Sequence, residues 1–209
     1  TNAGYEKAKA SIEASMEKLR TDYLDLLLIH QPFGDYYGTY RAMEELYKAG
    51  RLRAIGVSNF GPDRYLDIQH FAEIKPAVNQ IETHVFQQQK TAKEYLKKYG
   101  CQIESWGPFA EGRKDMFTNP VLTQIGEKYG KTAAQTALRF LLQSDVVVGY
   151  DAGKLLGNME HLNDILSLHS SPPIPPYGII LHVQQYTVPA TDWQGNCHFP
   201  PIKRRGKAS

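Results

Sequence analysis

Hydrophobic positions recur along most of the chain at two different spacings, and the two spacings alternate. Ala8, Ile12, Met16 and Leu19 lie at near-helical spacing with Glu and Lys between them, which predicts an amphipathic helix. The apolar run that follows, residues 23–29, is short and nearly continuous. Its length and composition are typical of a strand buried on both faces of a parallel sheet.

The same unit repeats along the chain. Further strands are predicted at the apolar runs 54–58, 77–81, 101–106 and 145–148. Helical patterns are predicted at about 40–50, 62–73, 92–100, 120–129 and 132–142. Residues 33–38 are expected to form a Gly- and Asp-rich loop before the first of these helices. Gly50 and Gly100 are typical helix stops, Thr132 is a typical N-cap, and Tyr95 and Tyr99 are expected to pack in the core.

Five predicted strands that alternate with helices indicate a parallel α/β fold, either an open sheet or a closed barrel. No GxGxxG motif follows a strand, which disfavours a dinucleotide-binding Rossmann fold. We expect this part to span residues 1–150. Residues 151–209 are rich in proline and are expected to form a divergent, poorly ordered tail, with 172–176 extended and a possible strand at 179–183.

Composition narrows the class of protein. The 209 residues are 42% hydrophobic and 22% charged, with a net charge of +2, which is ordinary for a globular domain and gives no reason to expect a nucleic-acid or membrane partner. Cys101 and Cys197 suggest no disulfide framework, so a cytoplasmic location is expected. The histidines share no metal-ligand spacing. The sequence does not begin with Met and is expected to be a fragment or a processed piece.

Polar and aromatic side chains lie at the carboxyl ends of four of the predicted strands. The four strand ends are His30–Pro32, Ser58–Phe60, Gln80–Glu82 and Trp106–Pro108. In a (β/α) barrel, functional groups gather at the carboxyl ends of the strands. One polar strand end is unremarkable, whereas four in succession predict one shared site.

These segments resemble the aldo/keto reductase family over about residues 3–148. The motifs that carry the resemblance are residues 24–32, 56–60, 79–82 and 105–109. Within the family, the sequence of two segments is closest to the microbial branch that includes 2,5-diketo-gluconate reductases and prostaglandin F synthases. These segments are 31–35 and 106–112. The resemblance implies a partial (β/α)8 TIM-type barrel with about five of its eight strands. It also implies an NADPH-dependent reductase of aldehydes or ketones.

The resemblance assigns a role to each strand end. Ser58, Asn59 and Gln80 would hold the nicotinamide carboxamide, because a hydroxyl and two amides supply matching donors and acceptors. Trp106 offers a flat stacking surface, and His30 could polarise the substrate carbonyl. The implied catalytic residue is His30, and the implied cofactor-binding residues are Ser58, Asn59, Gln80, Trp106, Gly107, Pro108 and Phe109. A strand-end histidine, a Ser-Asn turn and a core tryptophan are the non-functional alternatives.

The resemblance also leaves alternatives open. The family's proton-donating Tyr and its Lys and Asp partners have no match here, and the phosphate-binding pattern after the last strand is replaced by residues 149–154. Reductase activity is therefore expected to be impaired. A non-catalytic remnant, an assembly module that associates through unpaired strand edges, and a different barrel enzyme remain alternatives. Glu111, Arg113 and Lys114 would cover a pyrophosphate or form an ordinary charged loop.

Overall fold

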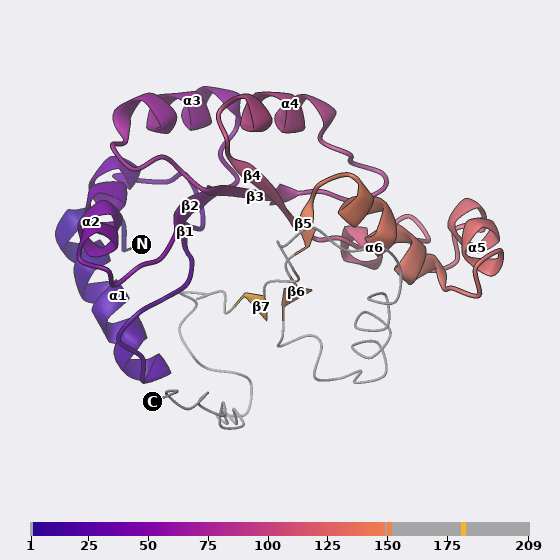
Figure 1. The fold of residues 1–209 in the computed structure, drawn as a ribbon, viewed down its shortest axis with the longest axis horizontal. Helices are drawn as coiled ribbons and strands as arrows, with labels where there is room; N and C mark the ends of the chain where they lie inside the picture. Colours follow the sequence, from indigo (N-terminus) through magenta and orange to yellow (C-terminus); the bar gives the residue numbers. More distant parts are fainter. Residues whose placement is uncertain (1, 149, 152–180, 183–209) are drawn as a thin grey trace, which may run out of the picture.

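The computed structural model describes residues 2–148, 150–151 and 181–182. Helices and strands alternate along the first of these stretches (Figure 1). The strands are β1 Leu27–Ile29, β2 Ile55–Ser58, β3 Val78–Glu82, β4 Gln102–Trp106, β5 Val147–Val148, β6 Tyr150–Asp151 and β7 Leu181–His182. The helices are α1 Tyr5–Leu19, α2 Tyr36–Lys48, α3 Pro62–Phe71, α4 Lys90–Lys98, the short 3-10 turn η1 Ala110–Gly112, α5 Pro120–Glu127 and α6 Ala133–Gln143.

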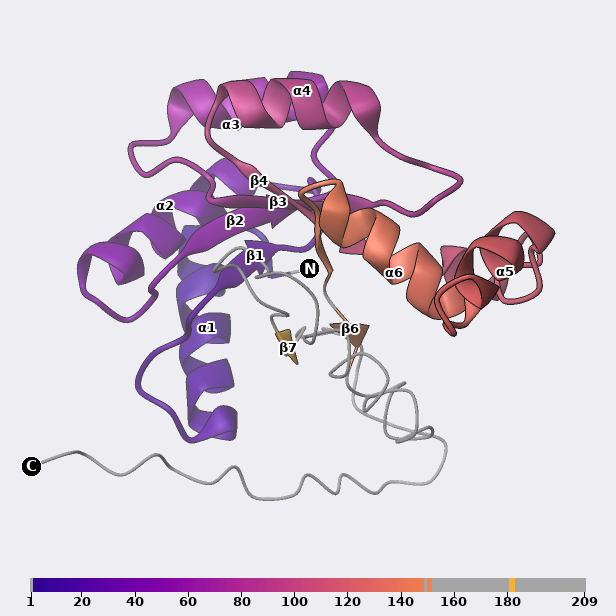
Figure 2. The same ribbon diagram turned by 45° about the vertical axis from the view of Figure 1, so that its right-hand side comes forward.

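The first five strands form one parallel sheet in the order β1-β2-β3-β4-β5, which confirms the predicted parallel α/β fold. The sheet curves, and helices α1 to α4 lie along its outer side (Figures 1 and 2). Strands β6 and β7 pair separately, so part of the possible strand at 179–183 is confirmed. The predicted extended segment 172–176 and most of the predicted tail lie outside the described residues.

Two helix starts show how local chemistry sets a boundary. Thr132 is the N-cap of α6, as the sequence predicts, and it forms a capping box with Gln135. The loop predicted for 33–38 is wrong at its end, because α2 already begins at Tyr36. The Asp35 carboxylate accepts a 2.8 Å hydrogen bond from the Gly38 backbone N–H and so satisfies a donor of the first turn.

The predicted burial of the first strand, β1, is also wrong in part. The run 23–29 was expected to be buried on both faces, but only Ile29 is buried, while Leu27 and Leu28 are partly exposed. Within the described residues β1 pairs with β2 alone, so one side of this strand lacks the neighbour that a central strand has.

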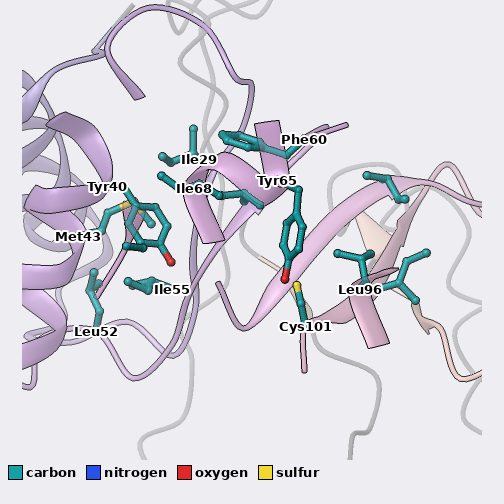
Figure 3. Close-up of a cluster of buried hydrophobic side chains, with 14 of the residues drawn as sticks. Ile29, Tyr40, Met43, Leu52, Ile55, Phe60, Tyr65, Ile68, Leu96 and Cys101 are labelled. Atoms are coloured by element: carbon teal, nitrogen blue, oxygen red, sulfur yellow. The ribbon is translucent and has the colours of Figure 1, made fainter. Parts of the chain in front are cut away.

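The main core lies between the outer face of the sheet and the helices (Figure 3). Its strand residues alternate in sequence, as side chains on one face of a strand must. They meet buried helix residues such as Tyr40, Tyr65 and Leu96. Tyr95 and Tyr99 pack here as predicted, with ring centroids 5.6 and 6.2 Å from that of Tyr65. The strand residues are Ile29, Ile55, Val57, Ile81, Ile103, Val146 and Val148.

Among the residues that the structure describes, no helix combines the length and the apolar character that crossing a membrane requires.

Gly56 lies in the middle of β2, where the neighbouring strands leave no room for a side chain. A Cβ at this position would be 2.6 Å from the Val78 carbonyl oxygen and 2.7 Å from Leu28 Cδ2. We expect Gly56→Ala to lower the free energy of unfolding by about 1–3 kcal/mol, because backbone must move. Denaturant unfolding measures this change. Adding Leu28→Ala removes only the side-chain contact, so a full rescue by that second substitution would contradict the explanation.

Candidate active site

The inner face of the sheet, opposite the core, carries a row of polar side chains. Ser58 pairs in register with Gln80, and Gln80 pairs with Glu104. Register partners in a parallel sheet point to the same face, and residues two apart along a strand share that face. Trp106 therefore lies on the same face as Glu104, one step nearer the carboxyl ends. Leu28 pairs with Gly56, which brings His30, two residues later, level with Ser58.

Asn59 connects three of these strand ends. Its Nδ2 donates to the Ser58 Oγ at 3.2 Å and to the His30 backbone oxygen at 3.3 Å, and its Oδ1 accepts from Trp106 Nε1 at 2.7 Å. The backbone of Asn59 has φ of 60°, in the left-handed region that asparagine tolerates better than most residues. The Ser58 hydroxyl donates to the Gln80 backbone oxygen at 2.9 Å.

Trp106 is anchored by one hydrogen bond at the edge of its indole ring. The hydrogen bond from its indole N–H to Asn59 fixes the plane of the ring, and the side chain is partly exposed at the carboxyl end of β4. It belongs to neither buried hydrophobic cluster. Gly107, with φ of 62°, turns the chain directly after it. A flat ring fixed by one edge at a strand end is suited to stacking against a planar ligand.

Glu104 is a site residue that the sequence analysis did not identify. Its side chain is fully buried, and its Oε1 accepts a 2.9 Å hydrogen bond from Gln80 Nε2. Burial raises the pKa of Glu104 to about 7, and the hydrogen bond from Gln80 opposes that rise. A signal was present in the sequence, since Glu104 is a charged residue inside a strand and shares the parity of Trp106.

The remaining predicted residues lie around this row. His30 is exposed just after β1. Pro108 is buried and Phe109 partly buried, and the Phe109 ring lies 5.5 Å from that of Phe117. The segment after them is charged and exposed, with Arg113 and Glu111 3.7 Å apart. Its position fits both alternatives, a cover over a ligand and an ordinary loop.

A tyrosine with Lys and acidic partners does occur, but not at a strand end. The Tyr5 hydroxyl and the Lys9 ammonium both donate to the Glu45 carboxylate, between α1 and α2. Glu45 raises the pKa of the Tyr5 phenol, which is opposite to what an acid catalyst needs. The ends of β1 to β4 carry no tyrosine beside a lysine.

Metal binding has no support in the described part of the chain, where no group of three or more His, Cys, Asp and Glu side chains could hold an ion.

Comparison with known proteins identifies the class. The model of the aldo/keto reductase family matches residues 2–176, so the chain belongs to that family. The match extends past Val148, where the resemblance to the family was expected to end. The glyoxal reductase of Bacillus subtilis is 50% identical over 145 residues, which cover 69% of this chain and 52% of that protein. The chain thus spans about half the length of the curated relatives that it matches.

Solved structures agree with this family. MGS-M4, an aldo-keto reductase enzyme from a Medee basin deep-sea metagenome library, matches with a TM-score of 0.69 and 39% identity, over 70% of this chain and 55% of that chain. An aldo-keto reductase complexed with NADPH matches with a TM-score of 0.65 and 30% identity, over 69% of this chain and 50% of that chain. The predicted partial barrel is therefore confirmed.

The pKa of Glu104 gives the chain a specific pH dependence. Its pKa is 4.5 in a free chain and about 7 in the fold, so folding favours the protonated form. The stability that protonation contributes is fully present below pH 4.5 and is lost as pH rises through 7. We expect the unfolding free energy of the wild type, relative to Glu104→Gln, to fall by about 3 kcal/mol across this range.

Denaturant unfolding of both chains between pH 4.5 and 8.5 measures this difference. The register partners of Glu104 are the uncharged Gln80 and Val147, and the next acid on the same face is Glu82, which pairs with Trp106. Glu127→Gln, on an exposed face of α5, is the matched control and should show no such trend. A difference that stays constant with pH would contradict the assignment.

Proposed function

We propose that the described strand ends form the nicotinamide side of an NADPH-dependent carbonyl reductase site. The observation that carries the proposal is the hydrogen-bonded row that joins Ser58, Asn59, Gln80 and Trp106 at the carboxyl ends of β2 to β4. The family resemblance implies this role for Ser58 and Gln80, and the two residues are register partners in the sheet. The family and the NADPH complex of a relative support the choice of cofactor.

The donor set fits a nicotinamide ring. A primary amide needs both an acceptor and a donor, and the amides of Asn59 and Gln80 with the Ser58 hydroxyl offer both kinds of group. Trp106 supplies a ring surface beside them. The cofactor, when bound, supplies a hydride to the carbonyl carbon of the substrate. Gly107, Pro108 and Phe109 form the turn that ends this side of the proposed site.

His30 is proposed to act on the substrate. It lies at the end of β1, level with Ser58, and an imidazole N–H there would donate to the carbonyl oxygen and stabilise the charge that develops on it. The oxygen must also gain a proton, and the ends of β1 to β4 offer no tyrosine paired with a lysine for that transfer. We therefore propose that carbonyl reduction by this chain is impaired, since proton transfer contributes roughly 10²- to 10⁴-fold.

Cofactor binding tests the proposal directly. NADPH should quench the tryptophan fluorescence of the purified chain, and Trp106→Phe should remove most of that quenching by taking away the stacked indole. Oxidation of NADPH with glyoxal, chosen because a relative is a glyoxal reductase, measures turnover in the same samples. A folded chain that shows no quenching would reject this function and would favour a non-catalytic member of the family.

Self-association is a second proposal, and the sheet topology supports it. Among the described residues β1 and β5 are the edge strands of a five-stranded parallel sheet, and unpaired edges present backbone donors and acceptors to another chain. We expect the protein to elute as a dimer or larger species on size-exclusion chromatography, and a single monomer peak at all concentrations would contradict this.

We propose a cytoplasmic location together with the reductase function. Cys101 is a buried free thiol, which fits a reducing compartment. The division at residue 150 also remains a proposal, to be tested by limited proteolysis.

A further inference from the structure

A fully buried glutamate lies next to the proposed carboxamide-binding glutamine. Glu104 is 0% exposed and Gln80 is 3% exposed, and the sheet register sets them side by side on β4 and β3. Gln80 Nε2 donates to Glu104 Oε1 at 2.9 Å. This contact belongs to the regular part of the sheet and does not depend on a loop.

Stability alone does not account for a glutamate at this position. A carboxyl group taken out of water costs free energy unless its partners compensate, and an apolar side chain of similar volume is often at least as stabilising. The register partner on the other side, Val147, is apolar, so of the two register partners only the Gln80 side chain can form a hydrogen bond with Glu104. The distinctive property of Glu104 is what it does to the Gln80 amide.

A carboxylate can accept hydrogen bonds but cannot donate them, whereas a glutamine amide has donors on Nε2 and an acceptor on Oε1. Two orientations of that amide have nearly the same shape and differ by a flip. Beside a carboxylate only one of them forms a hydrogen bond, the one with Nε2 turned to Glu104. Since burial raises the pKa of Glu104 to about 7, the group is mostly a carboxylate at pH 8.

We propose that Glu104 is a positioning residue that holds the Gln80 amide with Nε2 toward β4, so that Gln80 offers its Oε1 as an acceptor to the N–H of the nicotinamide carboxamide. The inference rests on the proposed function. Glu104 acts through Gln80 and does not itself contact the cofactor.

Three ligands, measured by fluorescence titration at pH 8, separate this role from a structural one. They are NADPH, its 3-acetylpyridine analogue, in which a methyl group replaces the amide NH2, and adenosine 2′,5′-bisphosphate, which lacks the nicotinamide. The wild type should prefer NADPH over the analogue by roughly three- to tenfold, the value of about one hydrogen bond. In Glu104→Gln, whose side chain can pair with either amide orientation, the preference should fall toward one.

Binding of the bisphosphate should stay unchanged in that variant, because the ligand does not reach Gln80. Glu104→Leu, which adds no polar group, is the second variant and should lose the preference as well. In a Gln80→Leu background, Glu104→Gln should have no further effect on the preference, since the residue through which Glu104 acts is gone.

The outcomes separate the two proposals. A wild-type chain that binds neither NADPH nor the bisphosphate overturns the proposed function and this inference with it. A wild type that binds NADPH, with a preference that persists in both Glu104 variants, overturns the inference alone. Equal weakening of all three ligands by the Glu104 substitutions would show a general structural role and would also overturn it.

Discussion

Truncating Phe60 to alanine is expected to lower the free energy of unfolding by about 3–5 kcal/mol, the usual range for a buried phenylalanine. Phe60 is 1% exposed and lies two residues after β2, where it packs in the main core (Figure 3). Its ring meets that of Tyr36 edge to face, with centroids 5.3 Å apart. The loss combines the transfer of the ring from water with the cavity left between β2 and the helices.

Phe60 also connects the segment after β2 to β3. Its backbone oxygen accepts a 2.9 Å hydrogen bond from Asn79 Nδ2, which is buried on the outer face of β3. Denaturant unfolding followed by circular dichroism measures the effect. Phe60→Leu, which keeps most of the apolar volume, is the matched control and should cost less than half as much. Equal losses in the two variants would show that ring volume is not what stabilises this position.

Replacing Asn59 should also lower the free energy of unfolding by a large amount. Two variants separate the loss of its hydrogen bonds from the strain of its backbone. Asn59→Gly removes all three side-chain hydrogen bonds, to His30, Ser58 and Trp106, and is expected to cost about 2–4 kcal/mol at about 1 kcal/mol each. Asn59→Ala should cost about 1 kcal/mol more, because alanine is strained at the φ of 60° that glycine adopts freely.

Unfolding experiments on both variants measure these differences, and the fluorescence of Trp106 supplies a local readout. The indole N–H that Asn59 holds is released in either variant, so both should shift the emission spectrum of the folded chain. If Asn59→Ala were as stable as Asn59→Gly, alanine would not be strained at this backbone angle and the explanation would be contradicted. An unchanged emission spectrum would contradict the role of Asn59 in fixing the Trp106 ring.

Most of the architecture could be predicted from the sequence, because its signals are local. The spacing of apolar residues in α1 and the short apolar runs of β2 to β5 depend on neighbours a few positions away, and strands at these places are present. The same holds for the cap at Thr132, whose partner lies three residues later. The start of α2 was missed, although Asp35 is a local signal, because glycines on both sides favoured a loop.

In the candidate site, too, some features follow from the sequence and others depend on the tertiary structure. The sequence by itself determined that His30, Ser58, Gln80 and Trp106 lie at or near the carboxyl ends of strands, and hence that they gather at one edge of a parallel sheet. Only the tertiary structure decided that Asn59 bonds to Trp106, 47 residues away, and that Gln80 donates to Glu104, 24 residues away. Such contacts depend on the register between strands, which the packing of the whole sheet against its helices sets and which no local pattern encodes.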